Sequence, residues 1–272
     1  MIQFLLKGIL RDKSRSILPI IVVSIGVALT VVLSAYMKGA FGDMIDQNAR
    51  FKTGHVKIMT KAYAENKAQL PNDLALLEVD KLMESLDKYF PEMEWVNRIR
   101  FGGLIDVPDA QGESKGQGPA AGIAINLFDP ESGEVQRMNI ESSMVKGTMP
   151  QQSGEAIIGN DFAEKLNLKI GDEITYFGTT MNGSMTFQNF IVSGTIRFGA
   201  AAMDRGAIVV DISDAQKMLD MENGTGELLG FSKLNIYEDE KVKLLADKFN
   251  EKYADDPDEF APIMLPLREQ NN

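Results

Sequence analysis

The chain has 272 residues, with 28 Lys and Arg against 39 Asp and Glu, a formal net charge of −11, and no cysteine. Such an acidic surface repels phosphate backbones, so the composition argues against nucleic-acid binding. The lack of cysteine excludes disulfides, lipidation at a cysteine and thiolate metal sites.

Residues 16–37, SILPIIVVSIGVALTVVLSAYM, contain no charged side chain. As a helix they would be roughly 33 Å long, which is enough to cross the roughly 30 Å hydrocarbon core of a bilayer. A cleaved signal peptide has a shorter apolar core and a small-x-small cleavage site, and neither is found here. The sequence therefore predicts a retained transmembrane helix at 16–37.

The charge on the two sides of this helix predicts its orientation. Residues 1–15 carry a net charge of +3, whereas residues 38–272 carry 24 basic and 38 acidic side chains, or −14. Because basic flanks resist translocation, we expect a cytoplasmic N-terminus and an extracytoplasmic bulk at the cell (inner) membrane. The cytoplasmic segment 1–15 begins with MIQFLLKGILRDK, which is either an amphipathic helix lying on the leaflet or a solvated start to the membrane helix.

Two strand–helix–strand patterns flank a long central region. The first comprises a strand at 55–59, a polar link at 60–73, a helix at 74–90 ended by Pro91, and a strand at 94–107 broken by Gly102-Gly103. The second comprises a strand at 231–238, a helix at 239–253 and an extended edge segment at 260–267 that contains two prolines. This order predicts an α+β fold in which a split βαβ (ferredoxin-like), membrane-proximal lobe, residues 38–103 and 229–272, contains an inserted lobe, residues 104–228.

The inserted lobe is predicted to be mostly β. Apolar patterns predict strands at 120–128, 155–159 and 206–212, a short helix through Phe162 and Leu166, and a helix at 214–221 begun by the capping-box spacing of Ser213 and Gln216. Asn182-Gly183 lies between two alternating runs within 174–196 and predicts a hairpin. Gly171-Asp172 predicts a turn before it. The segment GESKGQG, 112–118, is interpreted as a mobile surface loop because its spacing does not fit a phosphate-binding loop.

With these parts in order, the chain resembles the permease subunits of MacB/LolC/FtsX-type ABC transporters. The residues that carry the resemblance are TGHVKIMTKAYAENK (53–67), VKGTMPQQSGEAIIGNDFAEKLNLKIGDEITYFG (145–178) and GAIVVDISDAQKMLDM (206–221). The resemblance implies a MacB-like periplasmic core domain after the first membrane helix, followed in the family by three more membrane helices. Because this sequence ends at PLREQNN, about where the family re-enters the membrane, we expect it to be the front part of a permease.

The resemblance also implies the function and the partners. ATP would be hydrolysed by a separate ABC ATPase subunit, and the permease, paired with a second copy or a homologue, would couple hydrolysis to export, lipoprotein release or mechanotransmission. Membrane lipid and a lipoprotein or other periplasmic protein are the further partners expected. The alternative hypothesis is a membrane-anchored extracytoplasmic binding or adaptor module without a transport role.

No catalytic, cofactor or metal site is predicted, so we do not expect an enzyme. His55 is the only histidine and is interpreted as structural. A single-span hydrolase is the weakest hypothesis because no nucleophile has a supporting motif. Met181, Met185 and Phe187 flank the hairpin tip and are candidate contacts for a substrate or partner, since Met and Phe form adaptable apolar surfaces. Alternatively, these three side chains pack onto the second lobe.

Overall fold

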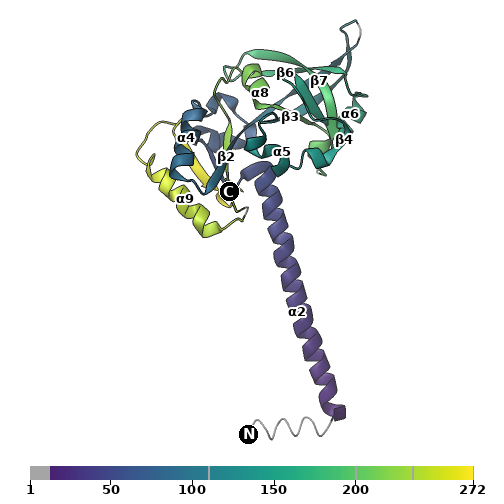
Figure 1. Ribbon diagram of the computed structural model, residues 1–272, viewed down its shortest axis with the longest axis vertical. Helices are drawn as coiled ribbons and strands as arrows, with labels where there is room; N and C mark the ends of the chain where they lie inside the picture. Colours follow the sequence, from purple (N-terminus) through teal and green to yellow (C-terminus); the bar gives the residue numbers. More distant parts are fainter. Residues whose placement is uncertain (1–12, 110, 200, 235, 272) are drawn as a thin grey trace. The chain divides into compact units, whose positions relative to one another are not determined.

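The computed structural model describes residues 13–271 except residues 110, 200 and 235 (Figure 1). The chain forms two compact units, divided between Asn48 and Ala49. The predicted amphipathic segment at the N-terminus falls almost wholly outside the described residues. An α+β architecture with an N-terminal apolar helix is confirmed.

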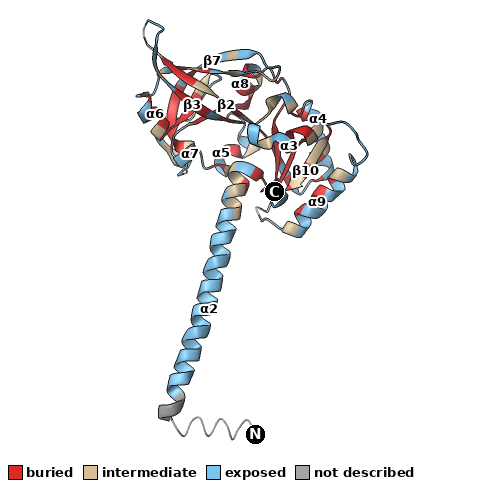
Figure 2. Cartoon of the chain, turned by 180° about the vertical axis from the view of Figure 1, so that it is seen from behind, coloured by how far each residue is buried: buried red, intermediate tan, exposed pale blue. Residues whose placement is uncertain are grey.

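The first unit contains the helix α2 (Lys13–Asn48). The predicted transmembrane stretch lies within it, with Pro19 near its start, and the helix continues for eleven residues beyond Met37, a stretch that contains no proline. Its apolar side chains are exposed along its length (Figure 2). Inside the helix, the hydroxyl of Thr30 donates to the carbonyl of Gly26 over 2.8 Å, which satisfies a polar group that would otherwise face lipid.

The second unit begins with a π-helical segment, η1 (Ala49–Thr53), and contains two β layers. The first layer is an antiparallel sheet with strand order β10-β1-β9-β2, in which β2 takes part through its first half. These strands are β1 (Val56–Thr60), β2 (Met93–Pro108), β9 (Glu227–Ser232) and β10 (Pro262–Pro266). The two prolines of β10 lie on the sheet edge, as predicted, where a missing backbone N–H is tolerated.

Two helices cover one face of this sheet, α4 (Val79–Tyr89) and α9 (Asp239–Glu251) (Figure 1). Both present apolar side chains at helical spacing to a shared core. That core includes Val79 and Leu86 from α4, Val242, Leu245 and Phe249 from α9, and Val56, Ile58, Trp95, Leu228 and Met264 from the strands. The other face of the sheet carries the alternate residues, among them Lys57 and Glu227.

The second layer is a closed ring of six strands. The second half of β2 pairs with β3, then β8, β5, β7 and β6 follow in order, and β6 pairs back onto β2. These strands are β3 (Ser114–Ile125), β5 (Glu155–Gly159), β6 (Glu173–Thr179), β7 (Met185–Ile196) and β8 (Ala207–Asp211), with β4 (Met144–Gly147) added outside β7. Closure leaves no free edge in the ring and encloses an apolar core.

Short helices cover the ring. Two of them, α6 (Asn160–Lys165) and α8 (Ile212–Met218), add Phe162 and Met218 to the core inside the ring. A separate apolar cluster forms on the outer side of β3, β5 and β8. Beside the ring lie α5 (Glu134–Arg137) and α7 (Ala201–Asp204), each a single turn.

One strand belongs to both layers. Residues 93–98 of β2 pair with β9 of the open sheet, and residues 99–108 pair with β3 of the ring. The predicted interruption at Gly102-Gly103 is wrong, because β2 runs through both glycines without a break. The predicted lobe boundary between residues 103 and 104 also falls inside β2, and the lobe boundaries stay a prediction.

The interpretation of residues 112–118 as a loop is wrong from Ser114 onward. These residues begin β3, with Gly116 opposite Val107 and Gly118 opposite Ile105. A Cβ on Gly118 would lie 2.6 Å from the Phe162 ring, so the small residue is what lets α6 pack onto the strand. Gly118 therefore serves close packing in this strand.

Three further local predictions need correction. The polar link after β1 contains a helix, α3 (Lys61–Asn66), whose first turn is capped by the Thr60 hydroxyl accepting from the Tyr63 N–H over 3.0 Å. Helix α8 begins earlier than predicted and is capped by Asp211, which accepts from the N–H of Ser213. Strand β9 begins upstream of the predicted strand at 231–238 and shares only residues 231–232 with it, because its pairing with β1 and β2 covers residues 227–232.

Candidate interaction site

The segment η1, which follows α2 in the chain, is held to the rest of the second unit by three contacts. The guanidinium of Arg98 donates to the carbonyl of Arg50 over 2.7 Å. The ring of Phe51 meets that of Phe198 edge-on, with 5.8 Å between centroids. The side-chain amide of Gln270 donates to the carbonyl of Thr53 over 3.0 Å. These contacts come from β2, from the loop after β7 and from the last described residues, so η1 is tied to three separate parts of the fold.

Arg98 is the centre of a buried ion-pair network. Its guanidinium donates to the carboxylate of Glu134 over 2.5 and 3.0 Å, and both side chains are fully buried. Arg137 adds a second cation to Glu134 at 2.7 Å and reaches Glu94 on β2 at 2.8 Å. Its guanidinium also lies 4.3 Å from the ring centroid of Phe231. A bidentate, fully hydrogen-bonded pair of this kind fixes geometry strongly.

The hairpin of β6 and β7 carries the three residues that the sequence singled out. Met181 lies in the loop, where its side chain packs half-buried against the core of the ring and its N–H donates to the carbonyl of Leu219 over 2.8 Å. Met185 and Phe187 point outward from β7 and are 84% and 73% exposed. The structure therefore brings Met185 and Phe187 together on one face and separates Met181 from them.

Two further apolar side chains share that outward face. In the hairpin register Phe177 lies directly opposite Phe187, and Ile191 follows on the same side of β7. All four side chains, Phe177, Met185, Phe187 and Ile191, are exposed, and we name them the outer hairpin face. Sequence reasoning missed Phe177, although counting equal steps on either side of Asn182 pairs residue 177 with residue 187.

The hairpin tip is fixed to the ring. The side-chain amide of Asn182 donates to the carboxylate of Asp220 over 2.7 Å, next to the backbone bond between Met181 and Leu219. On β6, the Tyr176 hydroxyl donates to the carbonyl of Gly102 over 2.9 Å. Burial raises the pKa of Tyr176 to about 12, so this hydroxyl keeps its proton at neutral pH. The outer hairpin face is thus presented by a rigid support.

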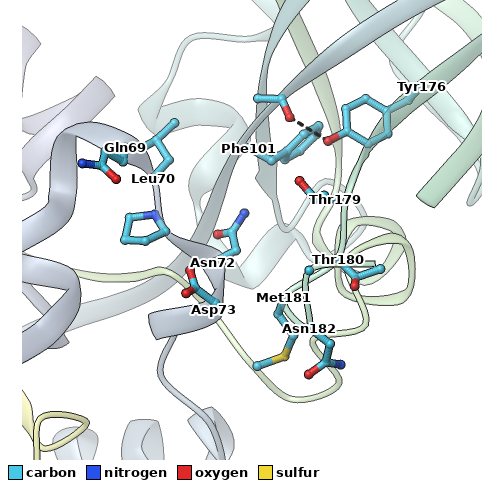
Figure 3. A pocket seen from close by; sticks show the side chains of 13 residues that line it. Gln69, Leu70, Asn72, Asp73, Phe101, Tyr176, Thr179, Thr180, Met181 and Asn182 are labelled. Atoms are coloured by element: carbon cyan, nitrogen blue, oxygen red, sulfur yellow. Dashed lines mark hydrogen bonds between the residues drawn. The ribbon is translucent and has the colours of Figure 1, made fainter. Parts of the chain in front are cut away.

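Next to the tip lies a cleft of about 630 Å³ (Figure 3). Residues 69–73, from the link after β1, line one side, and residues 179–183 of the hairpin loop line the other. Its groups are mainly neutral hydrogen-bonding side chains and include one carboxylate, that of Asp73. The carboxamide of Asn72 donates to the carbonyl of Arg100 over 3.2 Å. This lining suits a hydrated cleft or a neutral polar ligand.

No metal-binding cluster of side chains lies in the described part of the chain. Across residues 13–271 with their three gaps, no three His, Asp or Glu side chains are placed to hold a metal ion. The buried His55 ring accepts a hydrogen bond from the backbone N–H of Ser232 over 3.0 Å and lies 5.7 Å from the ring of Phe231. That environment is a packed one, and the absence of catalysis stays a prediction.

The comparison with known families decides what this architecture is. The family model of the MacB-like periplasmic core domain matches residues 16–237. The chain belongs to this family. The predicted resemblance to MacB-type permeases is thereby confirmed, and its most specific part, residues 145–178, corresponds in this MacB-like domain to β4, β5, α6 and β6.

A solved structure shares the fold of this MacB-like domain. The periplasmic region of MacB from Actinobacillus actinomycetemcomitans matches with a TM-score of 0.51 and 9% sequence identity. The match covers 79% of this chain and 90% of that one. At this identity the likeness concerns the fold alone. No curated protein matches the chain in sequence.

Helix α2 fits the membrane anchor expected of this MacB-like chain. In the part of the chain that the structure describes, it is the one helix long and apolar enough to cross a bilayer, and its most apolar stretch is not buried by other residues. Such a helix in a monomer needs either lipid or partner helices around it.

Proposed function

We propose that this chain is the N-terminal part of the permease subunit of an ABC transporter. In this proposal it performs no chemical step itself. A separate ATPase subunit hydrolyses ATP, and the extracytoplasmic domain passes the resulting movement to a substrate or partner outside the membrane. Membership of the MacB-like family supports this function, and α2 supports a membrane anchor. The charge asymmetry across the helix supports a cytoplasmic N-terminus.

The observation that carries the proposal is the meeting of the two ends of the domain. Strand β1 pairs antiparallel with β10, with Val56 opposite Pro266. Just beyond this pair, the N–H of Leu267 donates to the carbonyl of His55 over 3.0 Å. The chain therefore enters and leaves the second unit at one place, which suits a domain carried between two membrane helices.

The strand order supports a description of the open sheet as a split βαβ, ferredoxin-like lobe. Two strand–helix–strand units interleave as β10-β1-β9-β2, and both of their helices cover the same face. In the proposed mechanism this lobe takes up movement through η1, and β2 passes it to the ring because that strand belongs to both layers. A continuous strand cannot change its length appreciably, so the two layers move together.

The outer hairpin face is the proposed contact for a lipoprotein or another extracytoplasmic protein. Its four apolar side chains lie on a rigid hairpin, and exposed Met and Phe make adaptable contacts. A second permease copy or a homologue completes the proposed assembly. Such an assembly would carry out export, release a lipoprotein or transmit force to a cell-wall enzyme.

Recovery of the partner ATPase tests the proposal. The full-length tagged chain is solubilised from native membranes in a mild nonionic detergent and captured, with an unrelated tagged single-span protein as the background control. We expect an ABC ATPase, identified by mass spectrometry, in the first sample only. Absence of any ATPase from both samples would remove the permease function and leave the adaptor hypothesis.

A distance measurement tests the coupling itself. Because the chain has no cysteine, Leu244→Cys introduces a unique spin-label site on α9 at a side chain that is 71% exposed. In the captured complex, we expect the distance between labels on two copies to differ between the ADP-bound and the ADP–vanadate-trapped states. A single unchanged distribution in both states would contradict mechanical coupling.

A further inference from the structure

A second cavity lies on the face of the open sheet that α4 and α9 leave uncovered. Its volume is about 320 Å³, at the small end of the roughly 300–1,000 Å³ typical of ligand sites. Lys57 and Met59 of β1 line it because they alternate with Val56 and Ile58, which face the apolar core. The remaining walls come from η1, from the turn after α3, from Arg100 of β2, from Glu227 of β9 and from Gln270.

The cavity is positively charged within an acidic protein. Four cationic side chains line it, Lys52, Lys57, Lys67 and Arg100, and the ammonium of Lys67 already donates to the carbonyl of Gln270 over 2.6 Å. The carboxylate of Glu227 also lines the cavity. That carboxylate already pairs with Lys57 over 2.8 Å, with both groups almost fully buried. The half-buried guanidinium of Arg100 forms no hydrogen bond or ion pair with the residues that the structure describes. The charges of Lys52 and Arg100 therefore attract an anion.

The carboxamide of Gln270 sets a second requirement for a ligand in this cavity, in addition to negative charge. This side chain is only 7% exposed, and its Nε2 donates to the carbonyls of Thr53 and Leu265, each over 3.0 Å. Its Oε1 is buried and has no partner among the described residues. Buried oxygens of this kind are nearly always hydrogen-bonded, so the acceptor needs an O–H or N–H donor from a molecule inside the cavity.

We propose that this cavity binds a phosphate ester that also carries a hydroxyl or ammonium donor, of the glycerophosphate or ethanolamine-phosphate type. The phosphate lies against Arg100 and Lys52, since guanidinium and ammonium groups are the usual partners of phosphate oxygens. The donor of the ligand satisfies Oε1 of Gln270. The cavity volume accommodates such a head group and is too small for acyl chains as well.

Two sources supply this chemistry, a phospholipid head group and a soluble phosphate ester. Lys52 is the fourth residue after the end of α2, so the site lies close in sequence to the proposed membrane anchor. The inference does not depend on the permease proposal, because its test uses the chain alone and no ATPase.

Binding is measured by titration calorimetry on the full chain in a nonionic detergent, with glycerophosphoglycerol as the probe. We expect saturable binding to the unaltered chain, at least tenfold weaker binding to Arg100→Gln and severalfold weaker binding to Lys52→Gln. The control Arg197→Gln removes an exposed arginine elsewhere and should leave the affinity unchanged. Dimethyl phosphate, which lacks a donor, should bind at least fivefold more weakly than glycerophosphoglycerol.

Several results would overturn the proposal. They are no saturable heat with the unaltered chain, equal affinity of Arg100→Gln and the unaltered chain, or equal affinity for the two phosphate esters. A thermal unfolding midpoint of Arg100→Gln close to that of the unaltered chain shows that the variant is folded, and the exposed Lys52 provides a second variant that perturbs no buried contact.

The source of the ligand is tested in nanodiscs of phosphatidylglycerol diluted in phosphatidylcholine. Native mass spectrometry counts the lipids retained by the unaltered chain, Arg100→Gln and Arg197→Gln. Retention of phosphatidylglycerol that is lost only in Arg100→Gln supports the cavity with a lipid ligand. Calorimetric binding without such retention supports the cavity with a soluble ligand. If both calorimetric binding and lipid retention are absent, the proposal is overturned.

Discussion

The guanidinium of Arg98 donates two hydrogen bonds to the carboxylate of Glu134, 36 residues further along the chain. This pair lies where β2 passes from the open sheet to the ring, because residue 98 is the last to pair with β9 and residue 99 the first to pair with β3. The same guanidinium reaches the carbonyl of Arg50 in η1. One side chain thus joins the two layers and the segment that follows α2.

Loss of this guanidinium should destabilise the second unit strongly. Arg98→Met leaves Glu134 as a buried carboxylate with Arg137 as its remaining cation, and breaking a buried pair costs about 3–5 kcal/mol. Urea unfolding followed by the fluorescence of Trp95, the only tryptophan, measures the loss. Arg197→Met, which removes an exposed ion pair, should cost about 0–1 kcal/mol. Equal costs for the two variants would contradict the role of Arg98.

Neighbouring glycines in β2 should respond differently to the same substitution. In Gly103→Ala the new methyl group would lie 2.2 Å from the Tyr176 ring and 2.5 Å from the Phe177 carbonyl, whereas Gly102→Ala meets nothing within 4 Å. Because overpacking costs about 1–3 kcal/mol, Gly103→Ala should lower the free energy of unfolding by at least that amount. Gly102→Ala should be close to neutral in the same urea assay. A comparable loss at both positions would show that the close approach of β6 is not the cause.

The buried pair of Lys57 and Glu227 should behave as a coupled unit. Burial lowers the pKa of Lys57 despite the attraction of Glu227, so the charged ammonium of Lys57 depends on that carboxylate. Lys57→Met and Glu227→Met should each destabilise the domain by about 3–5 kcal/mol, whereas the double variant that combines them should be neutral or more stable. A double-mutant cycle measures the coupling. Additive losses from the two single variants would contradict it.

The titration of Tyr176 should lower the free energy of unfolding of the domain at alkaline pH. The pKa of this tyrosine is raised from 10.0 when unfolded to about 12 when buried, so the folded state holds its proton over a range in which the unfolded state releases it. The stabilisation is fully present below pH 10 and is lost as the pH rises from 10 to 12. Tyr176→Phe removes this titration together with one hydrogen bond to Gly102, which is worth about 1 kcal/mol.

Urea unfolding of both proteins at several pH values between 8 and about 12 tests this linkage. The unaltered chain should lose more stability across the upper part of that range than Tyr176→Phe does. Parallel curves for the two proteins would show that the titration of Tyr176 contributes nothing.

The outer hairpin face should contact the extracytoplasmic partner. Photo-crosslinkers attached at Phe187→Cys and at Leu244→Cys sample two side chains of similar exposure, 73% and 71%, on different parts of the surface. We expect an adduct with an extracytoplasmic protein in intact cells from position 187 and not from position 244. The same adducts from both positions, or none from position 187, would contradict this contact.

Local signals predicted most of the regular structure in this chain. The strand at 155–159 matches β5, the helix at 239–253 matches α9 within two residues, and the hairpin at Asn182-Gly183 joins β6 to β7. These elements have strong periodicity or explicit turn chemistry. The helix α3 was missed because its six residues are too few to show a pattern.

The features of the fold and the site that could not be predicted from the sequence depend on contacts between residues far apart in the chain. Closure of the ring depends on pairing between β2 and β6, about 70 residues apart, and no local signal reports such a pairing. Gly118 of β3 is explained by the approach of Phe162 from α6, and Gly122 by the approach of Phe101 from β2. Of the site residues, Met185 and Phe187 were predictable from the hairpin signal. Arg98, Glu134 and the cavity cations were not, because buried charges look like surface charges in a sequence.

The antiparallel pairing of β1 with β10 gives the domain a direction-dependent response to load. A force that moves residue 55 away from residue 267, perpendicular to the strands, would break the hydrogen bonds between β1 and β10 one after another. The first to break would be those beside the Gln270–Thr53 contact. A displacement shared by both residues leaves all of these hydrogen bonds intact. The β1–β10 pairing therefore stays intact when residues 55 and 267 move together and opens when they diverge.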